Sequence, residues 1–157
     1  MNKLVKLALG IIGADLAATS VVAVKNAVEE NREIKTKHHK GFYEKYVKNN
    51  VPVYLGEFGC ANHKPGEGRR YQLYYLEYLS KCAATYGMGG FIWDNGATGT
   101  GKEIYGIIDH GTGEYLDAEF GAQIIAVCLK GFTDDSEGYT LRYIHDNAPV
   151  PDPKEEE

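Results

Sequence analysis

The sequence predicts an α/β fold in which parallel strands alternate with helices. Two short apolar runs, residues 51–55 and 89–93, lack the alternation of polar and apolar side chains that a half-exposed strand shows, which is typical of parallel strands buried on both faces. Between them, residues 69–86 carry aromatic and aliphatic side chains at helical spacing. A strand, a helix and a second strand in this order form a βαβ unit, and the two strands of such a unit are parallel.

Residues 1–40 form a distinct N-terminal segment with an apolar run at 7–24, interrupted by Asp15. Three interpretations stay open. Lysines before the run and small residues at its end favour a signal peptide or anchor. A membrane span is barely long enough, and Asp15 at its centre would cost about 2.5–3.5 kcal/mol. The third interpretation is a soluble amphipathic helix that runs on through residues 25–30. We expect a secreted or membrane-anchored protein, with the cytoplasm as the alternative.

The main unit, residues 41–149, opens with a short helix and the first strand. The helix presents an apolar face and should end at residues 49–50. The strand that follows runs into a Gly-Glu-Phe-Gly sequence, in which the glutamate is Glu57. We therefore expect the Glu57 carboxylate at the C-terminal end of a parallel strand, flanked by glycines.

The helix at 69–86 and the second strand complete the βαβ unit. The helix is expected to bury a stripe of tyrosines and smaller apolar side chains and to stop at Gly87. The expected members of this stripe are Tyr71, Tyr75, Tyr78, Leu79, Cys82 and Tyr86. The second strand ends at Trp93, at the same end of the sheet as Glu57, and the Asp-Asn-Gly sequence at 94–96 predicts a turn.

A loop, a helix and a last extended element follow the second strand. The loop at 97–102 is rich in glycine. Asp117 is a predicted N-cap for a helix that stops at Gly131. The expected buried face of that helix consists of Phe120, Ile124, Ile125 and Cys128. Residues 139–144 are expected to add a short strand or an extended wrap.

The composition excludes several classes of protein. The net charge of −5 argues against a nucleic-acid partner, since phosphate binding needs clustered lysines and arginines. The histidines and cysteines show no metal-ligand spacing, so neither a metal site nor a cofactor is expected. The 12 tyrosines suit flat, hydroxylated ligands such as sugars, although any single tyrosine more often fills a core or an interface. Residues 150–157 form an acidic, proline-rich tail.

Four sequence motifs together resemble glycoside hydrolase family 5, the cellulase family of endo-β-1,4-glucanases and related β-mannanases and xyloglucanases. They are VPVYLGEFG, which contains Glu57, the tyrosine-rich helix after it, GGFIWDNG, which contains Trp93, and GIIDHGTGEY. The resemblance runs from about residue 42 to residue 149. It implies a partial (β/α)8 TIM barrel that carries the last two strand–helix units, preceded by an N-terminal helix.

This resemblance implies functional roles for three residues. Glu57 matches the catalytic nucleophile, and Trp93 matches the tryptophan that stacks under the sugar next to the scissile bond. Asn95 lies in the same motif and is assigned to substrate binding, while Asp94 is assigned to the shape of the turn. A retaining glycosidase needs two carboxyl groups about 5–5.5 Å apart, a nucleophile and an acid/base, and Glu57 would be the nucleophile.

The chain departs from the family pattern in what it lacks. The family has an Asn-Glu pair after strand four whose glutamate is the acid/base, and no Asn-Glu pair suits that role here. Three hypotheses follow. The chain is part of an endo-β-1,4-glucanase that hydrolyses β-linked polysaccharide or oligosaccharide when a second chain supplies the missing strands, and is inactive alone. It is a non-catalytic remnant or weak carbohydrate-binding protein. Or it is a membrane-associated protein that uses residues 1–40.

Overall fold

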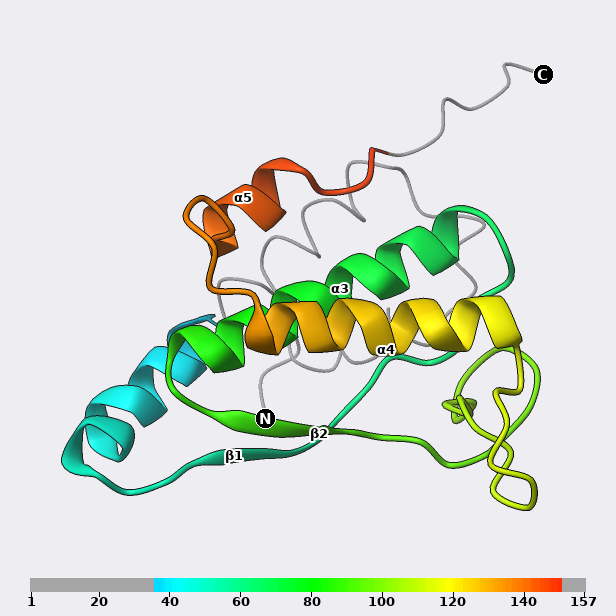
Figure 1. Ribbon diagram of the computed structural model, residues 1–157, viewed down its shortest axis with the longest axis horizontal. Coiled ribbons are helices and arrows are strands. Elements are labelled where there is room, and N and C mark those ends of the chain that lie inside the picture. Colours follow the sequence, from blue (N-terminus) through cyan, green and yellow to red (C-terminus); the bar gives the residue numbers. More distant parts are fainter. Residues whose placement is uncertain (1–35, 151–157) are drawn as a thin grey trace, which may run out of the picture.

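The structure of the protein, a computed structural model, describes residues 36–150 (Figure 1). The predictions made for residues 1–35 and for the tail at 151–157 lie outside the described residues. Helices and strands alternate along the described chain, which confirms the predicted α/β fold. Within residues 36–150, no helix combines the length and the apolar character that a membrane span requires.

A parallel pair of strands forms the sheet. β1 (Tyr54–Phe58) pairs with β2 (Gly89–Ile92) in parallel, as predicted. The expected limits of the first strand are wrong, because residues 51–53 have no strand partner within the described chain. The length of the partner explains the difference: β2 has four residues, so only the later part of the apolar run can pair with it. Glu57 therefore lies inside β1 rather than after it.

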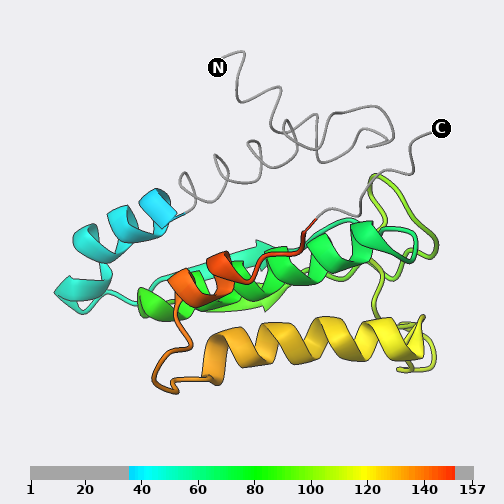
Figure 2. The same cartoon turned by 90° about the horizontal axis from the view of Figure 1, so that it is seen from above.

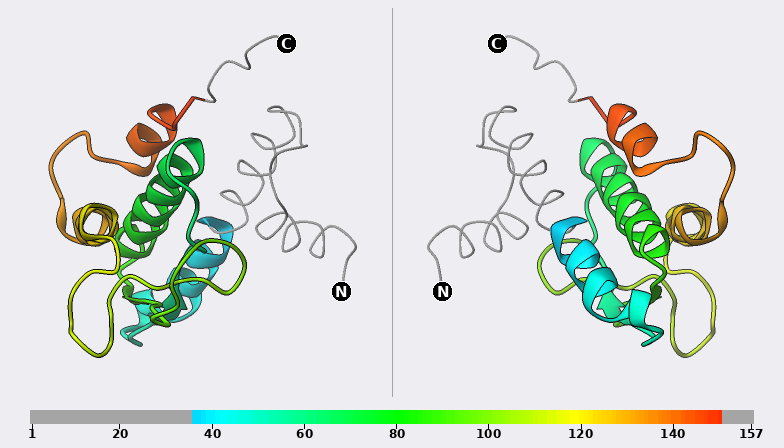
Figure 3. Two further views of the ribbon diagram at one scale, coloured as in Figure 1. Left: turned by 90° about the vertical axis from the view of Figure 1, so that its right-hand side faces the viewer. Right: turned by 90° about the vertical axis from the view of Figure 1, so that its left-hand side faces the viewer.

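Two long helices cover one face of the sheet. α3 (Glu67–Thr85) and α4 (Ala118–Thr133) lie side by side, and α5 (Leu141–Asp146) packs on α3 away from the sheet (Figure 1 and Figure 3). The core lies between the sheet and these two long helices. Its buried side chains are Phe58, Leu76, Leu79, Ile107, Phe120, Ile124 and Cys128. A smaller cluster, Tyr74, Tyr139 and Ile144, joins α3 to α5.

The first described helix, residues 36–45, lies beside the C-terminal end of α3 (Figure 2). Its Tyr43 ring lies 6.0 Å from the ring of Tyr86. The 3-10 turn η2 (Val47–Asn49) follows, and Asn50 then adopts the left-handed conformation with a φ of 61°. Asparagine tolerates this conformation because its short polar side chain can hydrogen-bond locally. The α-helix itself ends at residue 45, earlier than predicted, and the 3-10 turn carries the helical path to the expected end at residues 49–50.

α3 buries side chains on several of its faces and not along one stripe only. Leu79 and Cys82 are buried as expected, whereas the tyrosines of the predicted stripe are only half-buried. Other buried residues of α3 were not predicted, namely Gln72, Tyr74, Leu76, Ser80 and Ala83. The reason is that α3 contacts β2, α4 and α5 at once, so one amphipathic face cannot describe its packing.

α4 begins as predicted and ends later than predicted. The Asp117 side chain accepts a hydrogen bond from the Phe120 N–H at 2.9 Å, which confirms the N-cap. Gly131 does not stop the helix, which continues to Thr133. Gly131 is buried, and a Cβ added to it would stand 2.6 Å from the Cβ of Ser80. The glycine therefore marks a close approach of α4 to α3 rather than a helix end.

The expectation of a strand or extended wrap at residues 139–144 is wrong. The chain forms α5 there, with Thr140 as its N-cap. The Thr140 hydroxyl accepts a hydrogen bond from the Tyr143 N–H at 3.1 Å. Threonine is a favoured N-cap residue, and this cap is the local signal that separates a helix from a strand here. Ile144 then reaches the smaller core cluster against α3.

Candidate active site

Glu57 lies where β1 departs from regular pairing. From Leu55 to Phe58 the first strand advances three residues, while the paired stretch of β2 advances only two. The extra residue on β1 is the arrangement of a β-bulge. In a regular strand, Glu57 would share a face with Leu55 and point into the core. Instead, Leu55 and Phe58 both pack in the core, and Glu57 is exposed.

Trp93 directly follows β2 and lies at the same end of the sheet as Glu57, because the two strands are parallel. The backbone N–H of Trp93 donates to the carbonyl of Phe58 at 2.7 Å, so strand pairing carries on for one more residue. The Trp93 side chain is 41% exposed. Within residues 36–150, the Glu57 carboxylate makes no hydrogen bond or ion pair. An exposed carboxylate and an exposed indole therefore share this end of the sheet.

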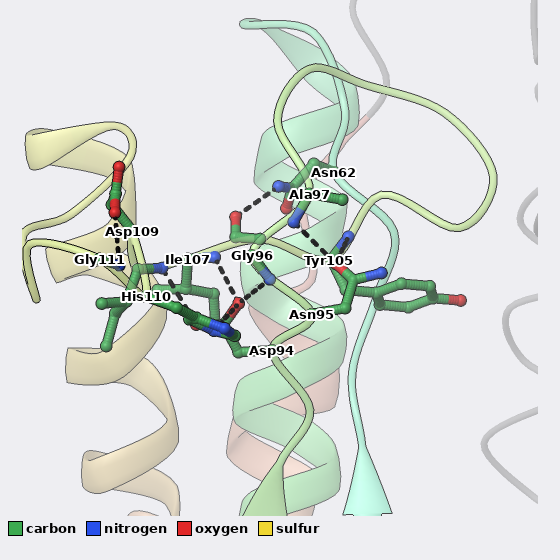
Figure 4. Close-up of polar contacts among 12 residues, drawn as sticks. Asn62, Asp94, Asn95, Gly96, Ala97, Tyr105, Ile107, Asp109, His110 and Gly111 are labelled. Atoms are coloured by element: carbon green, nitrogen blue, oxygen red, sulfur yellow. Dashed lines mark hydrogen bonds and ion pairs between the residues drawn. The ribbon is translucent and has the colours of Figure 1, made fainter.

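The Asp94 side chain, just after β2, hydrogen-bonds the backbone of residues 107–108. Its Oδ1 accepts hydrogen bonds from the N–H groups of Gly96 (2.8 Å) and Ile107 (3.1 Å), and its Oδ2 accepts one from Ile108 (3.0 Å) (Figure 4). The Nε2 of His110 lies 3.6 Å from Oδ1. Burial opposes ionisation, but the three N–H groups and His110 outweigh it and hold the pKa of Asp94 below its ordinary value. Residues 94–96 form no regular backbone turn, so the turn predicted there is replaced by a side-chain contact: the Asp94 carboxylate holds the Gly96 N–H and thereby shapes this segment.

Asn95 holds the next part of the same loop. Its Oδ1 accepts hydrogen bonds from the N–H groups of Ala97 and Tyr105, both at 3.1 Å (Figure 4). Its Nδ2 donates to the carbonyl of Glu103 at 2.9 Å. Both polar atoms of the side chain therefore bind the loop. The substrate-binding role of Asn95 stays a prediction, while these contacts show that Asn95 positions Tyr105.

Two further amides, which the sequence analysis missed, fix the segment after β1. Gln72 is 2% exposed, and its Nε2 donates to the carbonyl of Cys60 (3.2 Å) and to Oδ1 of Asn62 (3.0 Å). Its Oε1 accepts a hydrogen bond from the His63 N–H at 3.3 Å. Asn62 in turn donates to the carbonyl of Gly106 at 2.7 Å, which joins this segment to the loop after β2. A glutamine within a largely apolar helix face is the signal that could have identified Gln72.

A cavity of about 240 Å³ lies between the beginnings of α3 and α4 and the glycine-rich loop. Arg69 forms one of its walls. The Arg69 guanidinium lies 4.2 Å from the centre of the Phe120 ring and 2.8 Å from Oδ2 of Asp117. Neither Glu57 nor Trp93 lines this cavity. The candidate site is therefore the exposed end of the sheet and not the cavity beside it.

The sequence is similar to that of an endoglucanase over a short stretch. No protein-family model matches the chain. Over 68 residues, the chain is 34% identical to endoglucanase B of Neocallimastix patriciarum. This stretch makes up 43% of the chain and 14% of the length of that protein.

Several solved structures share the fold of the chain. It is similar to a Bacteroidetes-affiliated GH5 cellulase linked with a polysaccharide utilization locus, with 30% identity and a TM-score of 0.71 over 75% of this chain and 30% of that one. The GH5-4 broad-specificity endoglucanase from Bacteroides salanitronis gives 33% identity and a TM-score of 0.61, over 66% of this chain and 27% of that one. A GH5 lichenase variant from Caldicellulosiruptor sp. F32, in complex with cellotetraose, gives 26% identity and a TM-score of 0.53. The match covers 64% of this chain and 26% of that one.

These comparisons confirm the resemblance to glycoside hydrolase family 5 in both sequence and fold. The chain spans 30% or less of the length of each of these proteins. Its two parallel strands and the helices between and after them resemble part of a family 5 TIM barrel.

Proposed function

We propose that this chain is the part of a retaining β-glucanase that carries the nucleophile, and that it acts together with a chain that supplies the other strands. The observation that supports the proposal is that the exposed Glu57, in its bulge, and Trp93 both lie at the C-terminal end of two parallel strands. In (β/α)8 barrels, residues at this end of the strands do the chemistry. The β1–α3 and β2–α4 units would be the last two of the barrel, within residues 41–149.

The chemistry assigned to Glu57 needs an ionised carboxylate. Its oxygen would form a bond to the anomeric carbon as the glycosidic bond breaks, and the leaving oxygen would take a proton from a second carboxyl group. That second group would then remove a proton from the water that releases the sugar. The Trp93 ring would lie under the apolar C–H face of the sugar, where its π-cloud faces the positive charge that develops in the transition state.

The second carboxyl group is proposed to come from another chain. Asp94 is close to Trp93 along the sequence, but three backbone N–H groups occupy its carboxylate and its pKa is lowered. A general acid needs the opposite, a raised pKa that keeps it protonated near neutral pH. We therefore expect no acid/base partner about 5 Å from Glu57 within this chain.

The proposed substrate class rests on the relatives. One similar structure is a broad-specificity endoglucanase, and another is a lichenase in complex with cellotetraose. We infer that a β-linked glucan polysaccharide or oligosaccharide is the ligand of the Glu57 end of the sheet.

A complementation experiment tests this function. The chain would be mixed with a polypeptide that carries the first six strand–helix units of the Bacteroidetes-affiliated cellulase, and hydrolysis of carboxymethylcellulose would be measured. We expect turnover only in the mixture. Glu57→Gln should lower that turnover by several orders of magnitude, because it removes the nucleophile and leaves the shape unchanged.

The control variant is Glu137→Gln, at an exposed carboxylate in the connection between α4 and α5. It should leave turnover in the mixture unchanged. Turnover by the chain alone, or turnover in the mixture that survives Glu57→Gln, would contradict the proposal.

A second candidate function is sugar binding without catalysis. The 41% exposure of Trp93 favours it, since a stacking platform needs no acid/base partner. Oligosaccharide binding by the chain, with no turnover in any complemented mixture, would select this function. A secreted or membrane-anchored location, and a membrane contact through residues 1–40, remain proposals that partitioning of the full chain into lipid vesicles would test.

A further inference from the structure

The ring of Tyr105 lies against the chain just beyond β1. A Cβ added to Gly59 would stand 3.3 Å from Cδ1 of Tyr105 and 3.5 Å from the Cβ of Trp93. Tyr105 and Trp93 therefore both lie against Gly59, which is two residues after Glu57. A side chain at Gly59 would press on the Tyr105 ring and would be in ordinary contact with Trp93. The glycine thus permits a close approach of Tyr105 to the proposed catalytic end of the sheet.

The loop holds Tyr105 in this place from both sides. On one side, Asn95 accepts a hydrogen bond from the Tyr105 N–H at 3.1 Å. On the other side, Asn62 binds both neighbours of Tyr105: its backbone N–H donates to the carbonyl of Ile104 and its Nδ2 to the carbonyl of Gly106, each at 2.7 Å. In Figure 4 the Tyr105 ring points away from the loop that holds its backbone.

The hydroxyl of Tyr105 forms no hydrogen bond in the described part of the chain, although it interacts electrostatically with Tyr75. The ring is half-buried. Buried tyrosine hydroxyls normally find a partner. Tyr139 is an example, since it donates to Glu77 at 2.7 Å. A ring fixed through its backbone, whose hydroxyl can still form hydrogen bonds, lies beside an exposed indole. Such a surface can bind a ligand with both apolar faces and hydroxyl groups.

We propose that Tyr105 contacts the substrate and forms a second aromatic surface beside Trp93. This inference rests on the proposed function, since it extends the same sugar site. The ring of Tyr105 packs against the apolar C–H groups of a β-linked glucose unit, and its hydroxyl hydrogen-bonds a sugar hydroxyl. Asn95 and Asn62 are positioning residues for Tyr105 and do not themselves have to touch the sugar.

The test is a titration of the full chain with cellotetraose. Trp93 is the one tryptophan of the sequence, so its indole N–H gives a single resolved NMR signal whose shift reports binding at this site. Tyr105→Ala should weaken cellotetraose binding about tenfold, because it removes an aromatic contact. Tyr105→Phe should weaken it about two- to fivefold, because it removes only the hydroxyl.

The matched control is Tyr143→Phe, at a 50% exposed tyrosine on α5. It should bind cellotetraose as the unchanged chain does. Tyr105→Phe removes a hydroxyl that forms no hydrogen bond within residues 36–150, so it keeps the test valid even if Tyr105→Ala fails to fold. Binding by the unchanged chain with equal affinity in the Tyr105 variants would overturn this inference alone. No shift of the Trp93 signal in the unchanged chain would overturn both the sugar site and the inference.

Discussion

Asp94 shows how one carboxylate can organise a long loop. Its two oxygens accept three backbone N–H groups, one just after β2 and two from residues 107 and 108. Hydrogen bonds to a charged acceptor are worth about 1.5–3 kcal/mol each when their partners are partly buried. The ionised carboxylate accepts all three hydrogen bonds more strongly than the protonated carboxyl group would. Loop closure is therefore linked to the protonation state of Asp94.

This linkage predicts a pH dependence of stability. The folded-state pKa of Asp94 lies below the value in the unfolded chain, so its stabilising effect is complete above about pH 4 and is lost as the pH falls through the folded-state value. Asp94→Asn should lower the free energy of unfolding by about 2 kcal/mol at pH 7. The variant should also lose less unfolding free energy than the unchanged chain as the pH falls from about 5 to 3. Urea denaturation from pH 3 to pH 7 measures both effects.

The control for Asp94 is Asp135→Asn, at an exposed aspartate that makes no hydrogen bond or ion pair within the described chain. Its unfolding free energy should stay within about 0.5 kcal/mol of the unchanged chain. Equal pH profiles for Asp94→Asn and the unchanged chain would show that the loop does not depend on this charge.

Residue positions were predictable where they follow from strand direction. Glu57 and Trp93 were expected at one end of the sheet because each closes an apolar run, and the structure places them there. The bulge at Glu57 was not predictable, since it arises from how Leu55 and Phe58 both pair with β2. Gln72 was missed for a related reason: its partners, two backbone groups and the Asn62 side chain, lie in the segment after β1, and no periodicity in the sequence records them.

At the scale of elements, the contact between α3 and α4 depends on one missing side chain. Gly131 lies in α4, and a Cβ there would stand 2.6 Å from the Cβ of Ser80 and 2.9 Å from the carbonyl oxygen of Glu77. A neighbouring ion pair, Lys130 to Glu77 at 3.1 Å, spans the same two helices. The backbone of α4 can approach α3 this closely only because residue 131 has no side chain.

Gly131→Ala should therefore destabilise the protein. In an open helix, alanine in place of glycine is favourable by about 1 kcal/mol, but overpacking a close contact costs about 1–3 kcal/mol. We expect a net loss of about 1–2 kcal/mol in the free energy of unfolding, measured by urea denaturation. Gly41→Ala is the matched control: Gly41 is also helical, has nothing within 4 Å of an added Cβ, and should gain about 0.4–1 kcal/mol. A gain at both positions would show that the helices can separate at little cost.

Helix positions were more predictable than helix ends. The N-cap at Asp117 is a local signal, and it is confirmed. Gly131 was misread because its role depends on the contact with α3, whereas the helix at residues 139–144 was missed although the Thr140 N-cap is a local signal for it. A glycine can end a helix or fit a close packing contact, and only the neighbouring helix decides which.

At the scale of the whole molecule, the sheet has a surface that the described helices do not cover. Tyr54 is 64% exposed and Phe91 is 61% exposed, with their ring centres 6.2 Å apart. Trp93 adds a third exposed aromatic side chain at the end of β2. Within residues 36–150, each strand pairs only with the other, so each has one unpaired edge. Unpaired edges next to exposed apolar side chains favour association with other chains.

The global architecture was the part of the prediction that depended most on resemblance. Periodicity alone predicts a βαβ unit, and the structure confirms it. It cannot predict how many strands a sheet has, because strands far apart in sequence can pair in one sheet. The motifs around Glu57 and Trp93 supplied the comparison with a barrel, and the similar structures share this part of the fold.

The uncovered aromatic surface predicts that the chain alone associates with itself and is only weakly stable. The double substitution Tyr54→Thr and Phe91→Thr should reduce self-association in sedimentation velocity and lower the binding of the dye ANS, because it removes two adjacent exposed rings and keeps β-branched residues suited to a strand. The control is Leu129→Gln, at a 59% exposed leucine on α4, which should leave the association unchanged. If Leu129→Gln dissolves the assemblies and the double substitution does not, the helical face is the associating surface. A monomer with a cooperative unfolding transition in the unchanged chain would show that the open sheet is stable without further strands.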